Sequence, residues 1–240
     1  MKRIIAIIQA RMGSTRLPGK VMMDIGDRPV LAHLIGRLKQ VPLVHDIVVA
    51  TTSQPRDSVI EQLCRELNIK VYRGSEVDVL SRYVEAARLF KADVIFRATS
   101  DEPYKDPQVI EQVLKAHLES KADYTCNNLV KTFPDGSTVE IVNGSILEKV
   151  NRLGKKPADR EHVTFYIYNH PKEFWIQNIE ARGKLRRPDL RYCLDTQEDL
   201  EVVRAIFDHL GSRKPYFTME QIISFLDEQK KLNPNFGLKK

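Results

Sequence analysis

Apolar and polar residues in the first half of the chain follow two alternating patterns. Residues 4–8 form a continuous apolar run, which is typical of a strand covered on both faces. Residues 29–39 instead place their leucines and Ile35 on one helical face. Strands that alternate with helices predict a parallel sheet with helices on both sides. The same two patterns predict further strands at 47–50, 70–72 and 93–96 and helices at 57–67, at 77–87 and from 106.

The second half of the chain is less regular. Residues 133–136 read Phe-Pro-Asp-Gly, which predicts a turn. The residues after Leu232 carry no periodic pattern, and we expect them to form a loose tail. The remaining segments predict strands at 138–142, 171–179 and 190–194, a helix or turn at 160–168, and helices from 196 and at 218–228.

Several of the predicted helices begin at residues that can cap them. Asp27 is a possible cap for the first helix, and residues 106–107 read Asp-Pro, a strong helix start. Residues 75–78 and 196–199 both fit a capping box. We expect capping to be the sole role of Asp78.

The composition is that of an ordinary globular protein. The chain has 240 residues, of which 42% are hydrophobic and 29% are charged. Its apolar runs are all shorter than the roughly 20 residues of a membrane span, so we expect no membrane insertion. The three cysteines, Cys64, Cys126 and Cys193, lie far apart without CxxC spacing, which argues against a disulfide scaffold or a zinc site. These features favour a cytoplasmic protein.

The formal net charge of +6 suits a polyanionic ligand. The paired basic residues, such as 155–156 and 186–187, are scattered along the chain. No basic stripe with interleaved aromatic residues is present, so we expect no nucleic-acid partner.

The segment QARMGSTRLPGK directly follows the first predicted strand. Such a loop lies at the carboxyl edge of an open α/β sheet, where ligands bind. Gly13 and Gly19 allow the backbone to approach a ligand, and exposed amides there can surround phosphate oxygens. Arg11, Arg16 and Lys20 add cations that suit phosphate charge.

Two common phosphate-binding motifs do not match this loop. A Walker loop has four residues between its glycines and Ser or Thr after the lysine, whereas here five residues intervene and Val21 follows Lys20. The G-x-G-x-x-G dinucleotide fingerprint is absent as well. From its chemistry alone, the segment is either a phosphate-binding loop or a solvated basic loop.

The run IIQARMGSTRLPGKV resembles the N-terminal signature of the cytidylyltransferases that activate acidic sugars. That family includes the acylneuraminate and 3-deoxy-manno-octulosonate enzymes, and the sequence is most similar to its spore-coat polysaccharide branch. The resemblance continues in the family's order at residues 47–52, 72–80, 97–103, 160–164 and 194–200.

This resemblance implies an α/β, single-domain nucleotidyltransferase fold over residues 1–240. It implies a mostly parallel twisted sheet with helices on both faces, and a small β subregion for dimerisation or acceptor binding. Residues 1–130 would form the nucleotide-binding part and residues 131–180 the acceptor and dimer part. Residues 181–240 would complete the sheet and supply the C-terminal helices. The family also implies a homodimer that uses Mg²⁺.

The resemblance assigns roles to individual residues. Lys20, Arg11 and Asp101 would be catalytic, and Asp101 and Asp195 would hold the metal, which typically takes one or two carboxylates plus phosphate oxygens and water. Arg160 and His162 would bind the acceptor. The residues implied to bind the nucleotide are Ala10, Arg11, Met12, Gly13, Ser14, Lys20, Arg73, Gly74 and Ser75.

For some of these residues a structural role is the alternative. Asp101 precedes Glu-Pro and fits a plain turn, and Asp195 fits a helix cap. Ser75 fits a cap, Arg73 a surface position, and a lone histidine such as His162 is more often a structural hydrogen-bonding group than a catalyst.

The sequence also departs from the family pattern. Ser100 replaces a glycine beside the first metal carboxylate, Glu102 adds a carboxylate, and Thr138 stands where the family carries an aspartate. Ser100 and Glu102 could change the metal surroundings or the acceptor pocket, and with Thr138 they leave the identity of the sugar open.

The resemblance predicts transfer of CMP from CTP to a sugar or sugar acid, in cell-surface or spore-coat polysaccharide synthesis. The acceptor hydroxyl would attack the α-phosphorus in line and pyrophosphate would leave. One alternative is a glycosyltransferase of similar architecture that uses a nucleotide sugar, but such enzymes usually carry a short Asp-x-Asp motif that is not found here. The other alternative is a non-catalytic protein that binds CTP.

Overall fold

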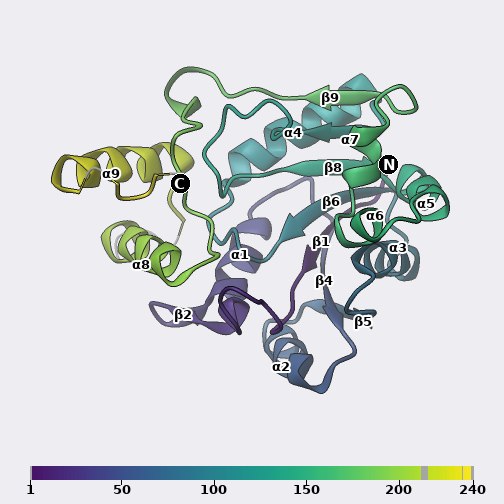
Figure 1. Cartoon of the computed structure of the whole chain (residues 1–240), viewed down its shortest axis with the longest axis horizontal. Coiled ribbons are helices and arrows are strands. Elements are labelled where there is room, and N and C mark those ends of the chain that lie inside the picture. Colours follow the sequence, from purple (N-terminus) through teal and green to yellow (C-terminus); the bar gives the residue numbers. More distant parts are fainter. Residues whose placement is uncertain (1, 212–215, 234, 239–240) are drawn as a thin grey trace.

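A computed structural model describes residues 2–211, 216–233 and 235–238. Its centre is a seven-stranded sheet with the strand order β5-β4-β1-β6-β8-β7-β9 (Figure 1). The strands are β1 Ile4–Gln9, β4 Asp46–Thr52, β5 Lys70–Gly74, β6 Val94–Thr99, β7 Tyr124–Cys126, β8 Glu140–Asn143 and β9 Ile176–Asn178.

The sheet is mostly parallel, as the sequence predicts. β1 pairs in parallel with both β4 and β6, and β4 pairs in parallel with β5. β8 runs antiparallel to its two neighbours, β6 and β7. Residues 4–8 of β1 are fully buried because β1 lies in the middle of the sheet and is covered on both faces.

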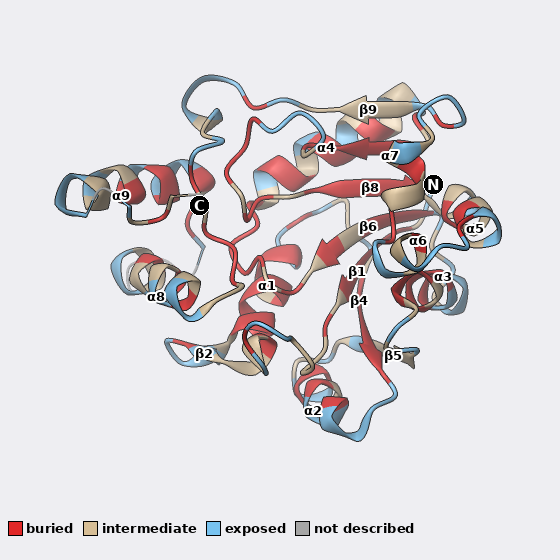
Figure 2. Cartoon of the chain, viewed as in Figure 1, coloured by how far each residue is buried: buried red, intermediate tan, exposed pale blue. Residues whose placement is uncertain are grey.

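Helices cover both faces of the sheet, and successive residues of β1 point to opposite faces. Ile4, Ala6 and Ile8 pack in one core with α1, α2, α4, α8 and α9, whereas Ile5 and Ile7 pack in a second core with α3, α5 and α7. Figure 2 shows the central strands buried, the edge strands β5 and β9 intermediate, and the outer sides of the helices exposed. The helices are α1 Val30–Leu38, α2 Ser58–Glu66, α3 Val79–Leu89, α4 Pro107–Ser120, α5 Gly144–Leu153, α6 Pro157–Glu161, α7 Phe165–Asn169, α8 Gln197–Ile206 and α9 Met219–Leu232.

A separate two-stranded antiparallel sheet precedes α1. It consists of β2 (Asp24–Ile25) and β3 (Arg28–Pro29). Because the chain stays extended to Pro29, that residue is the N-cap of α1, and no side chain caps the helix. The predicted capping by Asp27 is therefore wrong: Asp27 lies in the turn of this hairpin.

The capping box predicted at residues 75–78 is also wrong. α3 begins at Val79, and its cap is Asp78, whose carboxylate accepts a hydrogen bond from the Ser81 amide at 2.9 Å. Ser75 instead accepts a bond from the Asp78 amide at 3.0 Å, within the preceding loop. Val77 consequently precedes the helix and is 81% exposed.

The predicted strand at 190–194 does not form. Leu190 makes an isolated bridge to Leu238, and Arg191 makes one to Asp135. Among the described residues, no continuous strand lies beside them, so they do not form a strand themselves. The bridge to Leu238 also shows that the described tail residues 235–238 fold back onto the protein, so a loose tail is wrong for them. Residues 234, 239 and 240 of the predicted tail lie outside the described residues.

The other predicted caps are confirmed. Asp106 accepts a bond from the Gln108 amide at the start of α4, and its second oxygen accepts one from the Met219 amide of α9. Thr196 and Asp199 form a capping box at α8. Cys64, Cys126 and Cys193 are buried and unpaired. Within the described ranges, every helix is too short or too polar to cross a membrane.

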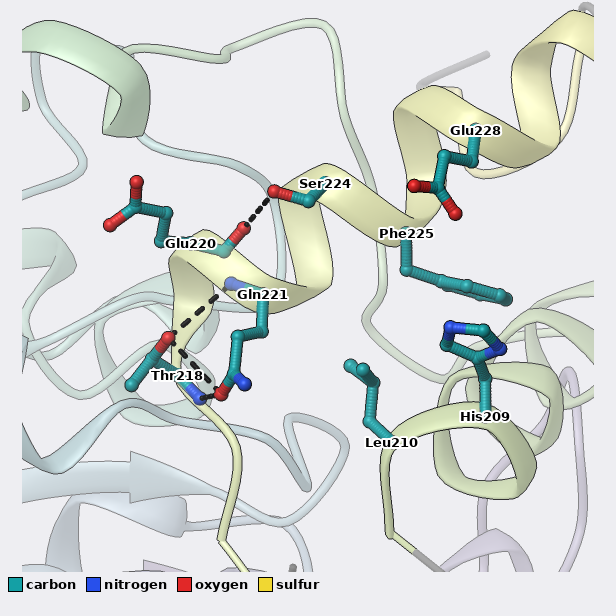
Figure 3. A pocket seen from close by; sticks show the side chains of 8 residues that line it. All are labelled: His209, Leu210, Thr218, Glu220, Gln221, Ser224, Phe225 and Glu228. Carbon is teal, nitrogen blue, oxygen red and sulfur yellow. Dashed lines mark hydrogen bonds between the residues drawn. The ribbon is translucent and has the colours of Figure 1, made fainter. Parts of the chain in front are cut away.

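We predict that the cap of α9 contributes about 1 kcal/mol to the free energy of unfolding. The Gln221 amide donates to the Thr218 hydroxyl at 3.3 Å, and the Gln221 side chain accepts from the Thr218 amide at 2.9 Å (Figure 3). Thr218→Ala removes the first of these bonds, and urea unfolding measures the loss. Ser224→Ala is the matched control in the same helix, because Ser224 caps nothing. Equal stability of the two variants would contradict the prediction.

Candidate active site

The predicted loop, Asp101 and Asp195 meet at the carboxyl edge of the sheet. The loop follows β1, Asp101 follows β6, and Asp195 precedes α8 (Figure 1). Side chains of all three segments line one cleft of about 290 Å³. The hollow drawn in Figure 3, between η4 (Phe207–Gly211) and α9, shares none of these lining residues.

Lys20 lies between the two aspartates. Its Nζ donates to Asp101 Oδ2 at 3.1 Å, to Asp195 Oδ1 at 2.9 Å and to the Leu194 carbonyl oxygen at 2.7 Å. An ammonium group has three N–H donors, so these bonds use its full capacity. The two carboxylates therefore share one cation.

Arginine side chains surround Asp195. Arg16 lies 2.8 Å from Asp195 Oδ1, and Arg191 donates to Asp195 Oδ2 at 2.7 Å. Burial by itself would raise the pKa of the Asp195 carboxyl, but the hydrogen bonds from Lys20 and Arg191 and the nearby positive charges outweigh it and hold that pKa below its ordinary value. Asp195 is therefore ionised at neutral pH and suited to bind a cation.

Glycines shape the loop at two points. Gly19 has a φ of 74°, in the left-handed region that favours glycine, and its amide donates to the Met12 carbonyl oxygen at 2.9 Å. This turn leads directly into η1 (Lys20–Met22) and so positions Lys20. At Gly13, a Cβ would lie 2.7 Å from the guanidinium of Arg56, so a larger residue there would displace the end of this exposed side chain.

The loop is held from the side of β4. The Met12 amide donates to Asp57 Oδ1 at 2.7 Å, and Thr52 donates to the second oxygen of the same buried carboxylate. Among the residues that the structure describes, the amides of Arg11 and Gly13 have no hydrogen-bond acceptor. They are free to donate to a ligand, which is what a phosphate-binding loop requires.

The other predicted loop residues are distributed around this turn. Ala10 is buried and lines the cleft together with Arg11 and Ser14, whereas Met12 and Gly13 do not line it. The Arg11 guanidinium lies 3.8 Å from Glu76. The Ser14 hydroxyl accepts a bond from the Leu17 amide at 3.5 Å.

Arg73, Gly74 and Ser75 lie at the end of β5 and do not line the cleft. Arg73 points toward α2: its Nε donates to the Thr52 carbonyl oxygen at 2.9 Å and its Nη1 to Glu61 at 2.9 Å. These bonds hold Arg73 in the structure, so its surroundings do not mark it as a ligand-binding residue.

Arg160 and His162 differ in their positions. Arg160 donates to both carboxylate oxygens of Asp78, with a shortest distance of 2.6 Å, and does not line the cleft. Asp78 thus pairs with Arg160 in addition to capping α3, so the expectation that capping is its sole role is wrong. His162 lies at the cleft wall.

Of the residues that depart from the family pattern, some line the cleft and others do not. Glu102 and Lys105 form a buried ion pair, and Lys105 also donates to the Thr138 carbonyl oxygen. Glu102 does not line the cleft, whereas Ser100 does. Glu102 therefore neutralises a buried lysine and does not add a third carboxylate to the cleft.

Sequence reasoning missed two arginines that line the cleft. Arg82 lies on α3, is 2% exposed and donates to the Ser75 carbonyl oxygen at 2.8 Å. Arg97 lies on β6 and pairs with the buried Glu140. These two arginines could have been identified because each is a basic residue within an otherwise apolar strand or helix face. Buried charges are rare unless they are paired.

The described residues contain no group of three or more His, Cys, Asp or Glu side chains that could hold a metal ion. Asp101 and Asp195 form a pair, with one oxygen of each directed at the same position, where the Lys20 ammonium lies. Magnesium is often bound by one or two carboxylates together with substrate phosphates and water. This pair of carboxylates therefore fits magnesium that arrives with a nucleotide.

A mostly parallel α/β sheet, a basic loop after its first strand and a carboxylate pair at the same edge define a nucleotidyltransferase. The sequence profile of the family described as cytidylyltransferase matches residues 5–232. The chain belongs to this cytidylyltransferase family.

Individual relatives agree with this assignment. The chain is 36% identical over 232 residues to the spore coat polysaccharide biosynthesis protein SpsF of Bacillus subtilis, and the match covers 95% of each chain. A solved cytidylyltransferase from Leptospira borgpetersenii has a TM-score of 0.87 and 29% identity, and the match covers 100% of this chain and 98% of that one. CMP:2-keto-3-deoxy-manno-octonic acid synthetase, solved with CTP, has a TM-score of 0.66 at 21% identity, covers 86% of this chain and 99% of its own, and supports the fold.

Proposed function

We propose that this enzyme transfers CMP from CTP to a sugar or sugar acid and releases pyrophosphate. Membership of the cytidylyltransferase family supports the transferred group. The names of the relatives, a spore coat polysaccharide protein and a 2-keto-3-deoxy-manno-octonic acid synthetase, support a sugar acceptor in polysaccharide synthesis. The observation that carries the proposal is the Lys20, Asp101 and Asp195 cluster beside the loop with free amides.

Magnesium is the metal that this cluster suits best. Asp101 and Asp195 would hold it, because their oxygens already converge on one position. When bound there with a nucleotide, magnesium would neutralise phosphate charge and favour attack at the α-phosphorus. Lys20 then has to give up its carboxylate partners.

The chain's own residues would position the nucleotide. Lys20, released from the aspartates, would donate to a phosphate oxygen, and Arg11 would leave Glu76 to do the same. The free amides of Arg11 and Gly13 would donate to the triphosphate as well. Each of these cations has a carboxylate partner within the protein, so the triphosphate would replace contacts that the protein already makes.

The reaction itself would need few groups from the protein. The acceptor oxygen forms a bond to the α-phosphorus, the bond to the bridging oxygen breaks, pyrophosphate leaves and the hydroxyl proton passes to water. Lys20 and Arg11 would offset the charge that develops on the phosphates. Most of the catalysis would come from holding the acceptor hydroxyl in line with the leaving group.

The remaining assignments stay proposals. We infer that Gly74 and Ser75 lie beside the base, with support from the bond that links Ser75 to Arg82 at the cleft. The contacts of Arg73 with Thr52 and Glu61 give no such support for Arg73. Residues 1–130 would bind the nucleotide and residues 131–180 the acceptor, within a homodimer. Trp175 and Val130, which are 60% and 48% exposed, support an interface in the second part. The unpaired cysteines fit a location in the cytoplasm.

Pyrophosphate release tests the proposal directly. Each of the four ribonucleoside triphosphates is incubated with magnesium and with a panel of keto-acid sugars and neutral sugars. We expect release with CTP and an acceptor from the panel, and none when the acceptor is left out. Release that is equal with all four triphosphates would contradict transfer of CMP.

A further inference from the structure

A second cavity of about 310 Å³ adjoins the nucleotide cleft. Arg97 and His162 line both cavities and therefore form the wall between them. The far side of the second cavity is lined by Asn128, Thr164 and Tyr168. A ligand in this cavity would lie directly beside a nucleotide in the cleft.

Arg97 is fixed in this wall by the sheet. It lies on β6 directly opposite Glu140 of β8 in the antiparallel register, and its Nη1 donates to the Glu140 carboxylate. Its Nη2 donates to the Gln9 side chain at 3.3 Å, and Gln9 lines the nucleotide cleft. The side chain of Arg97 keeps 15% of its surface exposed and lines both cavities.

The Glu140 carboxylate is held in place by hydrogen bonds from three side chains, of which Arg97 is one. Its side chain is 3% exposed, and its carboxylate also accepts bonds from the Tyr124 hydroxyl at 2.6 Å and from the Thr164 hydroxyl at 2.5 Å. Burial would raise the pKa of Glu140, but Arg97 and these hydroxyls together hold that pKa below its ordinary value. Glu140 therefore stays ionised and anchors Arg97.

The second cavity offers polar groups that suit a sugar. The Asn128 side-chain oxygen is buried and has no hydrogen-bond partner among the described residues. Hydroxyls of Thr164 and Tyr168 and the imidazole of His162 lie on the same walls, and Leu129 adds an apolar edge. Of the described side chains that line this cavity, Arg97 alone carries a permanent positive charge. Glu140 also lines it, and its carboxylate already accepts hydrogen bonds from Arg97, Tyr124 and Thr164.

We propose that this cavity binds the acceptor, that Arg97 binds the acidic group of a sugar-acid acceptor, and that Glu140 is the residue that positions Arg97. The proposal rests on the function proposed above. A negatively charged acceptor and a triphosphate repel each other at close range, and a cation in the wall between them offsets that repulsion. Arg160 is less suited to this role, because it lines neither cavity, whereas Arg97 lines both.

The test separates acceptor binding from nucleotide binding. In Arg97→Met we expect the KM for the sugar acid that supports turnover to rise about tenfold or more, since a charge-assisted hydrogen bond is lost. The affinity for CTP, titrated by calorimetry without acceptor, should change by less than about twofold. Arg97→Lys keeps the charge and should recover part of the loss. Glu140→Gln should raise the acceptor KM without lowering CTP affinity, whereas Glu148→Gln, which alters a surface ion pair with Arg88, should leave both unchanged.

Removing Arg97 leaves Glu140 buried without its cation, so Arg97→Met could fail to fold. Asn128→Ala and Tyr168→Phe probe the same cavity from its far side and should raise the acceptor KM alone. If these variants and Arg97→Lys all keep the wild-type acceptor KM, the assignment is wrong. A parallel loss of CTP affinity would instead make Arg97 a nucleotide-binding residue. Wild-type enzyme that releases no pyrophosphate with any panel sugar would overturn the proposed function, and this assignment with it.

Discussion

Asp101→Asn is expected to slow pyrophosphate release by about 10²–10³-fold, the range found when a single preorganised charged or polar group is removed from an active site. Asp195→Asn should have an effect of similar size. Both carboxylates contact the same Lys20 ammonium, so each variant would lose one of the two anions that are proposed to hold magnesium. Initial rates with CTP and an acceptor measure the effect.

These substitutions should affect turnover far more than folding. The side chains of Asp101 and Asp195 are 30% and 13% exposed, and Asn keeps their shape. Thermal unfolding provides the comparison, and Asp27→Asn is the matched control, because Asp27 is 79% exposed and does not line the cleft. Turnover near the wild-type rate in both Asp101→Asn and Asp195→Asn would exclude this pair as the catalytic metal site.

Lys20→Met is expected to cause the second large loss, again about 10²–10³-fold in turnover, because a cation that contacts the phosphates in the transition state is removed. The same substitution should strengthen the binding of magnesium, although it weakens turnover. Lys20 lies between Asp101 and Asp195, so its removal leaves two carboxylates without their shared cation. We therefore expect magnesium to bind more tightly to Lys20→Met than to the wild type when no nucleotide is present.

Calorimetric titration with magnesium alone measures this second effect independently of activity. Lys39→Met is the control, since the Lys39 ammonium contacts only a helix-end carbonyl oxygen, that of Leu67, far from the loop. Equal magnesium affinity in Lys20→Met and the wild type would mean that Lys20 does not compete with the metal for these carboxylates.

Local patterns predicted the first half of the fold well. The continuous apolar run of β1 requires a strand covered on both faces, and Asp106-Pro107 places the start of α4 at the correct residue. Patterns failed where partners distant in sequence decide the structure. Residues 190–194 have the composition of a strand, but the segments beside them contribute only single residues, Asp135 and Leu238.

The candidate site was predicted only in part for the same reason. The phosphate loop is contiguous in sequence, so its cations and glycines could be identified directly. The contacts of Lys20 with Asp101 and Asp195 span 81 and 175 positions, and only the resemblance to a family linked these residues. Arg97 was missed because its significance depends on Glu140, which lies opposite it only after β6 and β8 pair.

The charged side chains of the cleft are paired with one another. Lys20 binds the aspartates, Arg16 binds Asp195, and Arg11 lies near Glu76. Carboxylates near these cations take the place that phosphate oxygens would occupy. Nucleotide binding would therefore exchange one set of ion pairs for another and would not have to desolvate isolated charges.

The central claim is that this cleft joins CMP to a sugar acceptor, and analysis of the products tests it most directly. Wild-type enzyme, CTP, magnesium and the acceptor are incubated, and the products are quantified by mass spectrometry beside an Asp101→Asn control. The account predicts a CMP–sugar conjugate and pyrophosphate in equal amounts, and about a hundredfold less of both from the control in the same time. Tight CTP binding without any conjugate, or pyrophosphate accompanied only by free CMP, would contradict it.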